Sequence, residues 1–313
     1  MKKSLKVLLM LVVLVFSTFS AVLATKVLSE ERITTNTGDQ VRPAIYGDIV
    51  VWHDDRHGNS DIYGYNLKTK QEEFQITTDT NNQNSPAIYG DIVVWRDNRN
   101  YATTGWDIYG YNLKTGQEFP ICTEDGDQEE SAIYGDIVVW QDDRNGQYDI
   151  YGRNIRTMAE EFQITTNTKS QMKPAIYGDI VVWYDYRNNS WDIYGRNIRT
   201  MEEDFPICTF IDSTQSFPAI YGDIVVWNDN RNQATTGSDI YGYNLKTKQE
   251  FPICTFEKNQ TYPAIYCDRV VWEDDRNGNN DIYLAYIDVV CETTHKSLPI
   301  AQIMKILGLW PKE

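Results

Sequence analysis

Six acidic loops carry the residues that come nearest to a metal-binding pattern. In each loop an aspartate stands two residues before an arginine, as in DDRNGNND at residues 274–281. Oxygen ligands at alternating positions are typical of a calcium loop, but a fixed cation in the third position opposes a second cation there. We therefore expect structural Asp–Arg pairs, and neither a metal nor a cofactor. The pairs are Asp54/Arg56, Asp97/Arg99, Asp142/Arg144, Asp185/Arg187, Asp229/Arg231 and Asp274/Arg276.

Residues suited to catalysis are sparse. The chain has three histidines, His53, His57 and His295, and no serine in a nucleophile-elbow motif. Because most acidic residues recur in every repeat, no acid/base pair stands out. We expect a protein without catalytic activity. The enzymatic alternative is a carboxylate pair across a channel mouth that acts on an extracellular polysaccharide.

Candidate binding residues are those that differ between otherwise similar segments. Aromatic rings precede three consecutive DIY motifs, at Trp106, Tyr148 and Trp191. Such rings beside polar groups suit stacking on sugars or anchoring of a peptide, although they could also only cover their own hairpins. Two residues after a recurrent glutamine come Arg42, Ser85, Glu130, Lys173, Phe217 and Tyr262. One residue after a recurrent tryptophan come His53, Arg96, Gln141, Tyr184, Asn228 and Glu273.

The elements that must position these residues are six copies of one unit. The segment AIYGDIVVW and its variants begin at residues 44, 87, 132, 175, 219 and 264, a period of 43–45 residues. A fixed period of this length indicates a repeat architecture. Each unit contains four short segments rich in Ile, Val, Tyr, Trp and Thr and separated by turn residues, which predicts a four-stranded β-meander.

The continuously apolar IVVW segment predicts a strand that is covered on both faces. Six small sheets achieve this by stacking around an axis, so we expect an all-β, six-bladed β-propeller of four-stranded antiparallel blades. The last unit lacks its fourth strand, while ERITT precedes the first unit. We therefore predict that Ile33–Thr35 complete the sixth blade and close the ring. The blade tryptophans, expected between blades, are Trp52, Trp95, Trp140, Trp183, Trp227 and Trp272.

The repeat WxDDRNGNxDIYxxN, followed by an ITT-type strand, resembles the TolB-type propeller repeat over roughly residues 33–289. It is also similar to propeller repeats of archaeal cell-surface proteins. The resemblance implies a propeller that serves as an interaction platform, although no N-terminal domain of the TolB kind is recognisable here.

One face of such a ring carries the short Tyr-Gly-Asp and NLKT-type turns, and the opposite face carries the long polar loops. A glutamine lies four residues before each repeat alanine and is expected to ring the channel mouth on the long-loop face. The alternative is that each glutamine caps backbone groups of its own loop. The six are Gln40, Gln83, Gln128, Gln171, Gln215 and Gln260.

The chain ends and the overall charge define the compartment and exclude some partners. Residues 1–24 combine three lysines with an apolar run, which is typical of a secretory signal peptide; an uncleaved N-terminal anchor is the alternative. The propeller then spans residues 25–289, and residues 290–313 form a tail with one possible short helix. A formal net charge of −16 disfavours nucleic acid as a partner. We expect a secreted or cell-surface monomer that does not insert into the membrane.

Five cysteines with no CxxC pair give neither a disulfide framework nor a zinc site. Cys122, Cys208 and Cys254 replace threonine in fourth strands and are expected to be unpaired. Cys267 replaces a turn glycine, and we predict that it forms a disulfide with Cys291. For function, we expect a platform that binds a protein or a glycan through its long-loop face; the alternatives are the polysaccharide-acting enzyme and a structural surface-layer component.

Overall fold

The computed structural model describes residues 33, 34, 36, 38–278 and 280–289 of the 313-residue chain, and these residues form strands, turns and loops without a helix. All strands lie in the unit Asn36–Glu313. Blade 1 consists of β1 (Gln40–Tyr46), β2 (Ile49–Asp54), β3 (Asp61–Asn66) and β4 (Phe74–Gln75); blade 2 of β5 (Gln83–Tyr89), β6 (Ile92–Asp97), β7 (Asp107–Asn112) and β8 (Gln117–Cys122); blade 3 of β9 (Gln128–Tyr134), β10 (Ile137–Asp142), β11 (Asp149–Asn154) and β12 (Phe162–Gln163).

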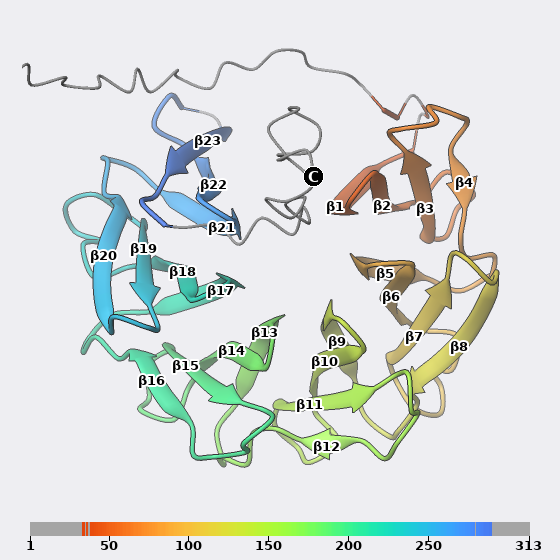
Figure 1. The fold of residues 1–313 in the computed structure, drawn as a ribbon, viewed down its shortest axis with the longest axis horizontal. Helices are drawn as coiled ribbons and strands as arrows, with labels where there is room; N and C mark the ends of the chain where they lie inside the picture. The colour runs from red at the N-terminus through yellow and green to blue at the C-terminus, as the bar shows by residue number, and fades with distance from the viewer. Residues whose placement is uncertain (1–32, 35, 37, 279, 290–313) are drawn as a thin grey trace, which may run out of the picture. The chain divides into compact units, whose positions relative to one another are not determined.

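The second half repeats this order. Blade 4 consists of β13 (Gln171–Tyr177), β14 (Ile180–Asp185), β15 (Asp192–Asn197) and β16 (Phe205–Cys208); blade 5 of β17 (Gln215–Tyr221), β18 (Ile224–Asp229), β19 (Asp239–Asn244) and β20 (Gln249–Cys254); blade 6 of β21 (Gln260–Tyr266), β22 (Arg269–Asp274) and β23 (Asp281–Tyr286). Each sheet is an antiparallel meander. The sheets are arranged around a central axis with the first strand of each blade innermost (Figure 1). The predicted six-bladed β-propeller is confirmed.

The strand predicted to close the ring is not present among the strands of the described residues. Blade 6 has three strands, β21, β22 and β23, within the described part of the chain. Ile33 and Thr34 are described and belong to no strand, and Thr35 lies outside the described residues. The N-terminal fourth strand of blade 6 therefore stays a prediction.

The apolar strands pack in the seams between blades, as their composition predicts. All six blade tryptophans are buried, with exposed fractions between 0% and 5%. Trp95, for example, packs with Val93 of its own blade against Val51, Ile62 and Ile76 of blade 1. Corresponding clusters surround Trp140, Trp183, Trp227 and Trp272. Burial of such rings is the main stabilising contribution of each seam.

The recurrent Asp–Arg pair fixes the tryptophan and the loop that follows it. In blade 3 the indole N–H of Trp140 donates to Asp142 Oδ2 at 2.9 Å, and Arg144 Nε donates to Asp142 Oδ1 at 2.9 Å. The Arg144 guanidinium also lies 4.4 Å from the centre of the Tyr151 ring. Equivalent indole and arginine contacts recur in all six blades. The prediction of structural pairing is confirmed, because the carboxylate oxygens are engaged by these donors.

The cysteines divide as the sequence predicts. Cys122, Cys208 and Cys254 are free, and Cys122 Sγ accepts a contact from Arg144 Nη2 at 3.0 Å. Cys267 is disulfide-bonded and occupies the turn at φ +59°, where the other blades have glycine. Its predicted partner, Cys291, lies outside the described residues.

Residues 1–24, predicted as a signal peptide, and the tail 290–313 also lie outside the described residues. Within the part of the chain that the structure describes, there is no helix with the length and apolarity needed to cross a membrane.

Candidate functional site

The candidate site is built from one bulge in the innermost strand of each blade. The register between the first and second strands shifts at this point, for instance between Val41 and Ala44 in blade 1. The central bulge residue has a positive φ of 50–55° in every blade, although none is glycine. A left-handed conformation costs roughly 1–2 kcal/mol for an ordinary residue. The six residues, called the channel ring below, are Arg42, Ser85, Glu130, Lys173, Phe217 and Tyr262.

The first four members of the channel ring form a polar half. Arg42 Nη1 donates to Ser85 Oγ at 2.7 Å and to Glu130 Oε1 at 3.0 Å. The Lys173 ammonium forms an ion pair with the other oxygen of the same carboxylate. One carboxylate from blade 3 is therefore shared by cations from blades 1 and 4. The ring-lining position that the sequence singled out thus brings together side chains from distant parts of the chain.

The remaining members form an aromatic half. The ring centres of Phe217 and Tyr262 lie 4.6 Å apart, and Lys173 Nζ lies 5.9 Å from the Phe217 ring centre. Behind them, Tyr184 contacts Phe217 at 5.9 Å and Trp191 at 4.7 Å between ring centres. Tyr262 is 54% exposed. The site thus offers one accessible ring that is held in place by a packed aromatic cluster.

A second polar layer supports the channel ring. Arg96 Nη1 donates to Glu129 Oε1 at 2.5 Å, and its guanidinium lies 4.6 Å from the Trp106 ring centre. Tyr148 Oη donates to Glu129 Oε2 at 3.2 Å. Tyr148 thus contacts the Glu129 carboxylate directly and Trp106 contacts the arginine bound to it, whereas Trp191 belongs to the aromatic half. All three predicted aromatic residues are half-buried, so they are packed components of the loop face and not freely exposed rings.

The recurrent glutamines do not form an open ring at the mouth. Five of them are fully buried, and Gln40 is half-buried. Their side-chain amides donate within their own loops: Gln83 Nε2 reaches the Asn81 carbonyl at 2.8 Å, and Gln128 Nε2 reaches that of Gly126 at 2.8 Å. The alternative role as loop caps is therefore the one observed. The bulge two residues later turns the channel-ring side chain toward the opening instead.

Neighbouring charges at the channel mouth favour the ionised form of the Glu130 carboxylate and the neutral form of the His53 imidazole. Burial alone would raise the pKa of Glu130, but Lys173 and Arg42 outweigh it and hold this pKa below its ordinary value. Burial lowers the pKa of His53, and the nearby Arg42 and Arg96 lower it further. Glu130 is thus unsuited to act as a general acid, since it does not hold a proton at neutral pH.

A pocket of about 240 Å³ opens between the innermost strands of blades 3 to 6. Its lining joins Glu130, Ser131 and Lys173 to Phe217 and Tyr262. Sequence reasoning did not single out Ser131, Glu129 or Tyr186, which contacts Trp191 at 4.9 Å. A signal for Ser131 was present, because every other blade has proline immediately before its repeat alanine.

The opposite end of the channel carries a ring of tyrosines from the AIYGD turns. Consecutive ring centres lie 4.7–4.9 Å apart. The same residue fills this position in all blades, so the ring is part of the repeat packing and provides no variation for specificity. Its members are Tyr46, Tyr89, Tyr134, Tyr177, Tyr221 and Tyr266.

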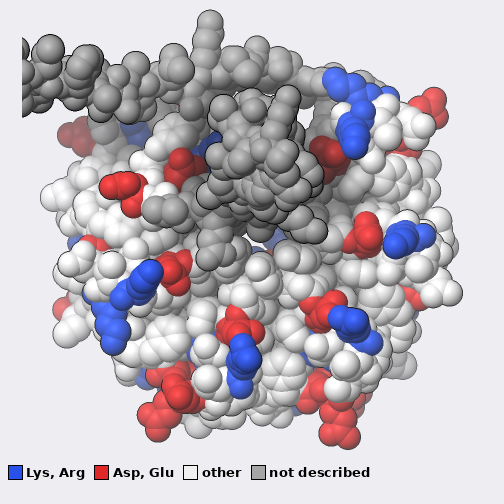
Figure 2. All heavy atoms as spheres, in the orientation of Figure 1, with Lys and Arg blue, Asp and Glu red and all other residues white. Residues whose placement is uncertain are grey.

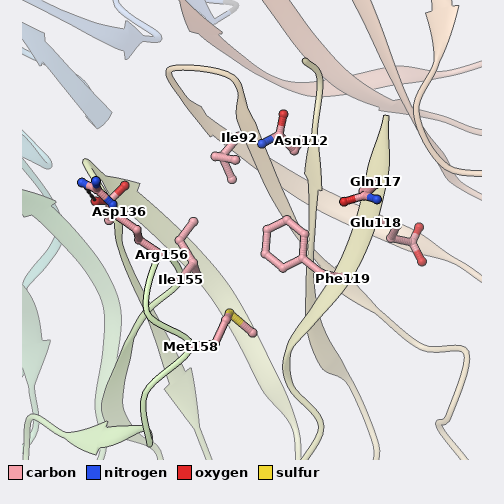
Figure 3. Close-up of a pocket in the computed structure, with 9 residues that line it drawn as sticks. All are labelled: Ile92, Asn112, Gln117, Glu118, Phe119, Asp136, Ile155, Arg156 and Met158. Atoms are coloured by element: carbon pink, nitrogen blue, oxygen red, sulfur yellow. Dashed lines mark ion pairs between the residues drawn. The ribbon is translucent and has the colours of Figure 1, made fainter. Parts of the chain in front are cut away.

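A groove of about 870 Å³ lies between blades 2 and 3. Ile92, Phe119, Ile155 and Met158 give it an apolar lining, and the ion pair between Arg156 and Asp136, 3.7 Å long, lies at one side (Figure 3). Basic and acidic side chains lie in neighbouring pairs around the face shown in Figure 2. Most of the residue types that line the groove recur between other blades. The groove is therefore a weaker candidate for a specific binding site than the channel ring, whose residue differs in every blade.

Comparisons with known proteins support the fold. The chain resembles TolB from Acinetobacter baumannii with 14% identity and a TM-score of 0.56, covering 77% of this chain and 62% of that chain. A putative TolB from Agrobacterium tumefaciens gives 14% identity and a TM-score of 0.55, with coverages of 82% and 93%. A prolyl endopeptidase gives 9% identity and a TM-score of 0.63, with coverages of 80% and 41%. At these identities the likeness shows a shared propeller fold alone.

No protein family and no curated protein matches this sequence. The predicted similarity to archaeal cell-surface propellers gains no support from these comparisons. The class defined by fold and site is therefore a six-bladed β-propeller with a variable channel mouth, and its fold is similar to that of the TolB structures.

Proposed function

We propose that this protein is a non-catalytic binding module that acts outside the cytoplasm and takes its ligand at the channel mouth on the long-loop face. The observation that carries the proposal is the bulge in every blade. Six strained backbone positions are occupied by six different side chains, all at one opening. Strained positions of this kind are typical of ligand sites, because the fold must compensate for their cost. The charged N-terminus followed by an apolar run supports the extracytoplasmic location.

Two other functions are less well supported by the geometry. A glycan-cleaving enzyme needs a second carboxyl group that can hold a proton, but Glu130 is paired with two cations and Glu129 is paired with Arg96. A surface-layer role would place the contacts on the rim or the tail. Assembly of the purified protein into sheets without a ligand would favour that role.

The test is binding to combined glycan and peptide arrays, followed by calorimetric titration of the hits. We expect Tyr262→Ala to weaken binding of a genuine ligand at least about tenfold, by loss of an aromatic anchor. Tyr286→Ala is the matched control, because Tyr286 is similarly exposed but lies at the other end of blade 6. Hits whose affinity is the same in both variants would contradict the proposal. Product analysis of each glycan hit separates binding from cleavage.

A further inference from the structure

The channel ring contains two cationic side chains and one carboxylate. Arg42 and Lys173 share the single carboxylate of Glu130, and in the layer behind them Arg96 is matched by Glu129. The six channel-ring residues by themselves therefore have one positive charge in excess, in a chain whose formal net charge is −16. The Arg42 side chain is 50% exposed, so its guanidinium can be approached by a ligand. An anionic group is the partner that this arrangement favours, because a second negative charge would balance the two cations of the channel ring.

Polar atoms without partners lie beside these charges. Ser131 Oγ is buried in the pocket lining and has no hydrogen-bond partner among the described residues. His53 Nδ1, close to Arg42 and Arg96, is also buried without such a partner, but His53 does not line the pocket. Other buried polar atoms of the described residues also lack partners, but Ser131 Oγ is the one among them that lines this pocket. Ser131 is also the one departure from the repeat's proline, which places a hydroxyl group at the pocket where the other blades cannot have one.

The opposite wall suits the face of a ring. Tyr262 presents an accessible aromatic surface, and Phe217 together with Pro218 and Pro263 lines the pocket beside it. The pocket, at about 240 Å³, lies below the range of roughly 300–1,000 Å³ that is typical of drug-sized ligands. Its size corresponds to one ring-sized unit of a larger ligand.

We propose that the channel mouth binds a carboxylate-bearing sugar, such as one uronic acid unit of an acidic glycan; this rests on the proposed binding function. The sugar carboxylate meets Arg42 and Lys173, a hydroxyl group serves Ser131, and the ring lies against Tyr262. An acidic peptide would supply the carboxylate but no ring of hydroxyl groups. Neutral sugars would leave the excess positive charge unpaired.

Calorimetric titration with tetragalacturonate, D-glucuronate and D-glucose tests the proposal. We expect the two uronates to bind and glucose to bind at least about tenfold more weakly, because it lacks the charge-assisted contacts. Lys173→Met should reduce uronate affinity about tenfold and weaken its salt dependence, whereas Lys173→Arg should retain binding. Ser131→Pro, which restores the repeat residue, should also weaken binding. Lys246→Met, on the turn face, is the control and should change nothing.

The outcomes separate this proposal from the one it rests on. Equal affinity for glucose and glucuronate, or unchanged uronate binding in a folded Lys173→Met variant, would overturn the acidic-sugar assignment. If no sugar binds but a peptide from the array binds and depends on Tyr262, the assignment fails while the binding function stands. If no hit of any class depends on Tyr262, both fail.

Discussion

Arg42 in blade 1 donates a hydrogen bond to Glu130 in blade 3 at 3.0 Å, although a whole blade lies between them in the sequence. The contact is possible because both residues occupy bulges of innermost strands. Lys173 approaches the same carboxylate from blade 4. The ion-paired group therefore connects blades 1, 3 and 4 across the channel mouth.

This connection predicts the effect of neutralising Glu130. Glu130→Gln leaves Arg42 and Lys173 close to each other without a shared anion, so we expect a loss of about 1–3 kcal/mol in the free energy of unfolding. Urea unfolding at pH 7 measures it. The control is Asp136→Asn, which breaks the exposed Arg156–Asp136 pair and should cost less than about 1 kcal/mol. Equal losses of unfolding free energy in the two variants would show that the ion pairs of Glu130 contribute no more than a surface ion pair.

The blade tryptophans are expected to stabilise the fold in two ways, through the packing of their rings and through the hydrogen bond of their indole N–H. Trp140→Phe keeps much of the ring packing but removes the donor to buried Asp142, so we expect a loss of about 1–3 kcal/mol in the free energy of unfolding. Trp191→Phe is the control, because this half-buried ring is held through ring contacts with Tyr184 and Tyr186. A variant Trp140→Phe as stable as Trp191→Phe would contradict the importance of the indole–carboxylate contact.

Much of the fold is readable from the sequence, whereas the geometry of the site is only partly so. The repeat AIYGDIVVW predicts strands, seams and ring because identical units must bury identical faces. The variable position after each glutamine was recognisable as well. Its backbone conformation was not, because nothing in the residue types Arg, Glu or Phe signals a positive φ. The pairing of Arg42 with Glu130 depends on the curvature of the ring, which local sequence patterns do not encode.

The aspartates of the DIY motifs predict how stability depends on pH. Burial raises the pKa of five of these carboxyl groups: Asp61, Asp107, Asp149, Asp192 and Asp239. The folded form then binds the proton more tightly than the unfolded form does. Their contribution to stability is full below the ordinary value of 3.8 and is lost as the pH rises through the raised folded pKa values.

Other carboxyl groups act in the opposite direction at lower pH. Burial would raise the pKa of Asp54 and Asp274, but hydrogen bonds from Arg56 and Arg276 keep each below its ordinary value. Their stabilisation is lost as the pH falls through those lowered values. We therefore expect the five raised groups to favour a greater free energy of unfolding at pH 4 than at pH 8, opposed by His53, whose lowered pKa favours protonation of the unfolded form as the pH falls. Urea unfolding from pH 4 to 8 measures this, and Asp149→Asn should flatten the slope; an unchanged slope would rule out Asp149 as a contributor.

Cys267 combines a strained turn with a covalent bond, and the two effects can be separated. At φ +59° a cysteine is less favourable than a glycine by about 1 kcal/mol. A disulfide typically stabilises a folded protein by about 2–4 kcal/mol, which is more than this strain. We expect the oxidised protein to be the most stable, Cys267→Gly to be intermediate, and the reduced protein to be the least stable. Thermal unfolding with and without a reductant gives this order. Because Cys267→Gly lacks the bond, reduction should leave its melting temperature unchanged; a reduced protein that is more stable than Cys267→Gly would show that the turn holds cysteine without strain.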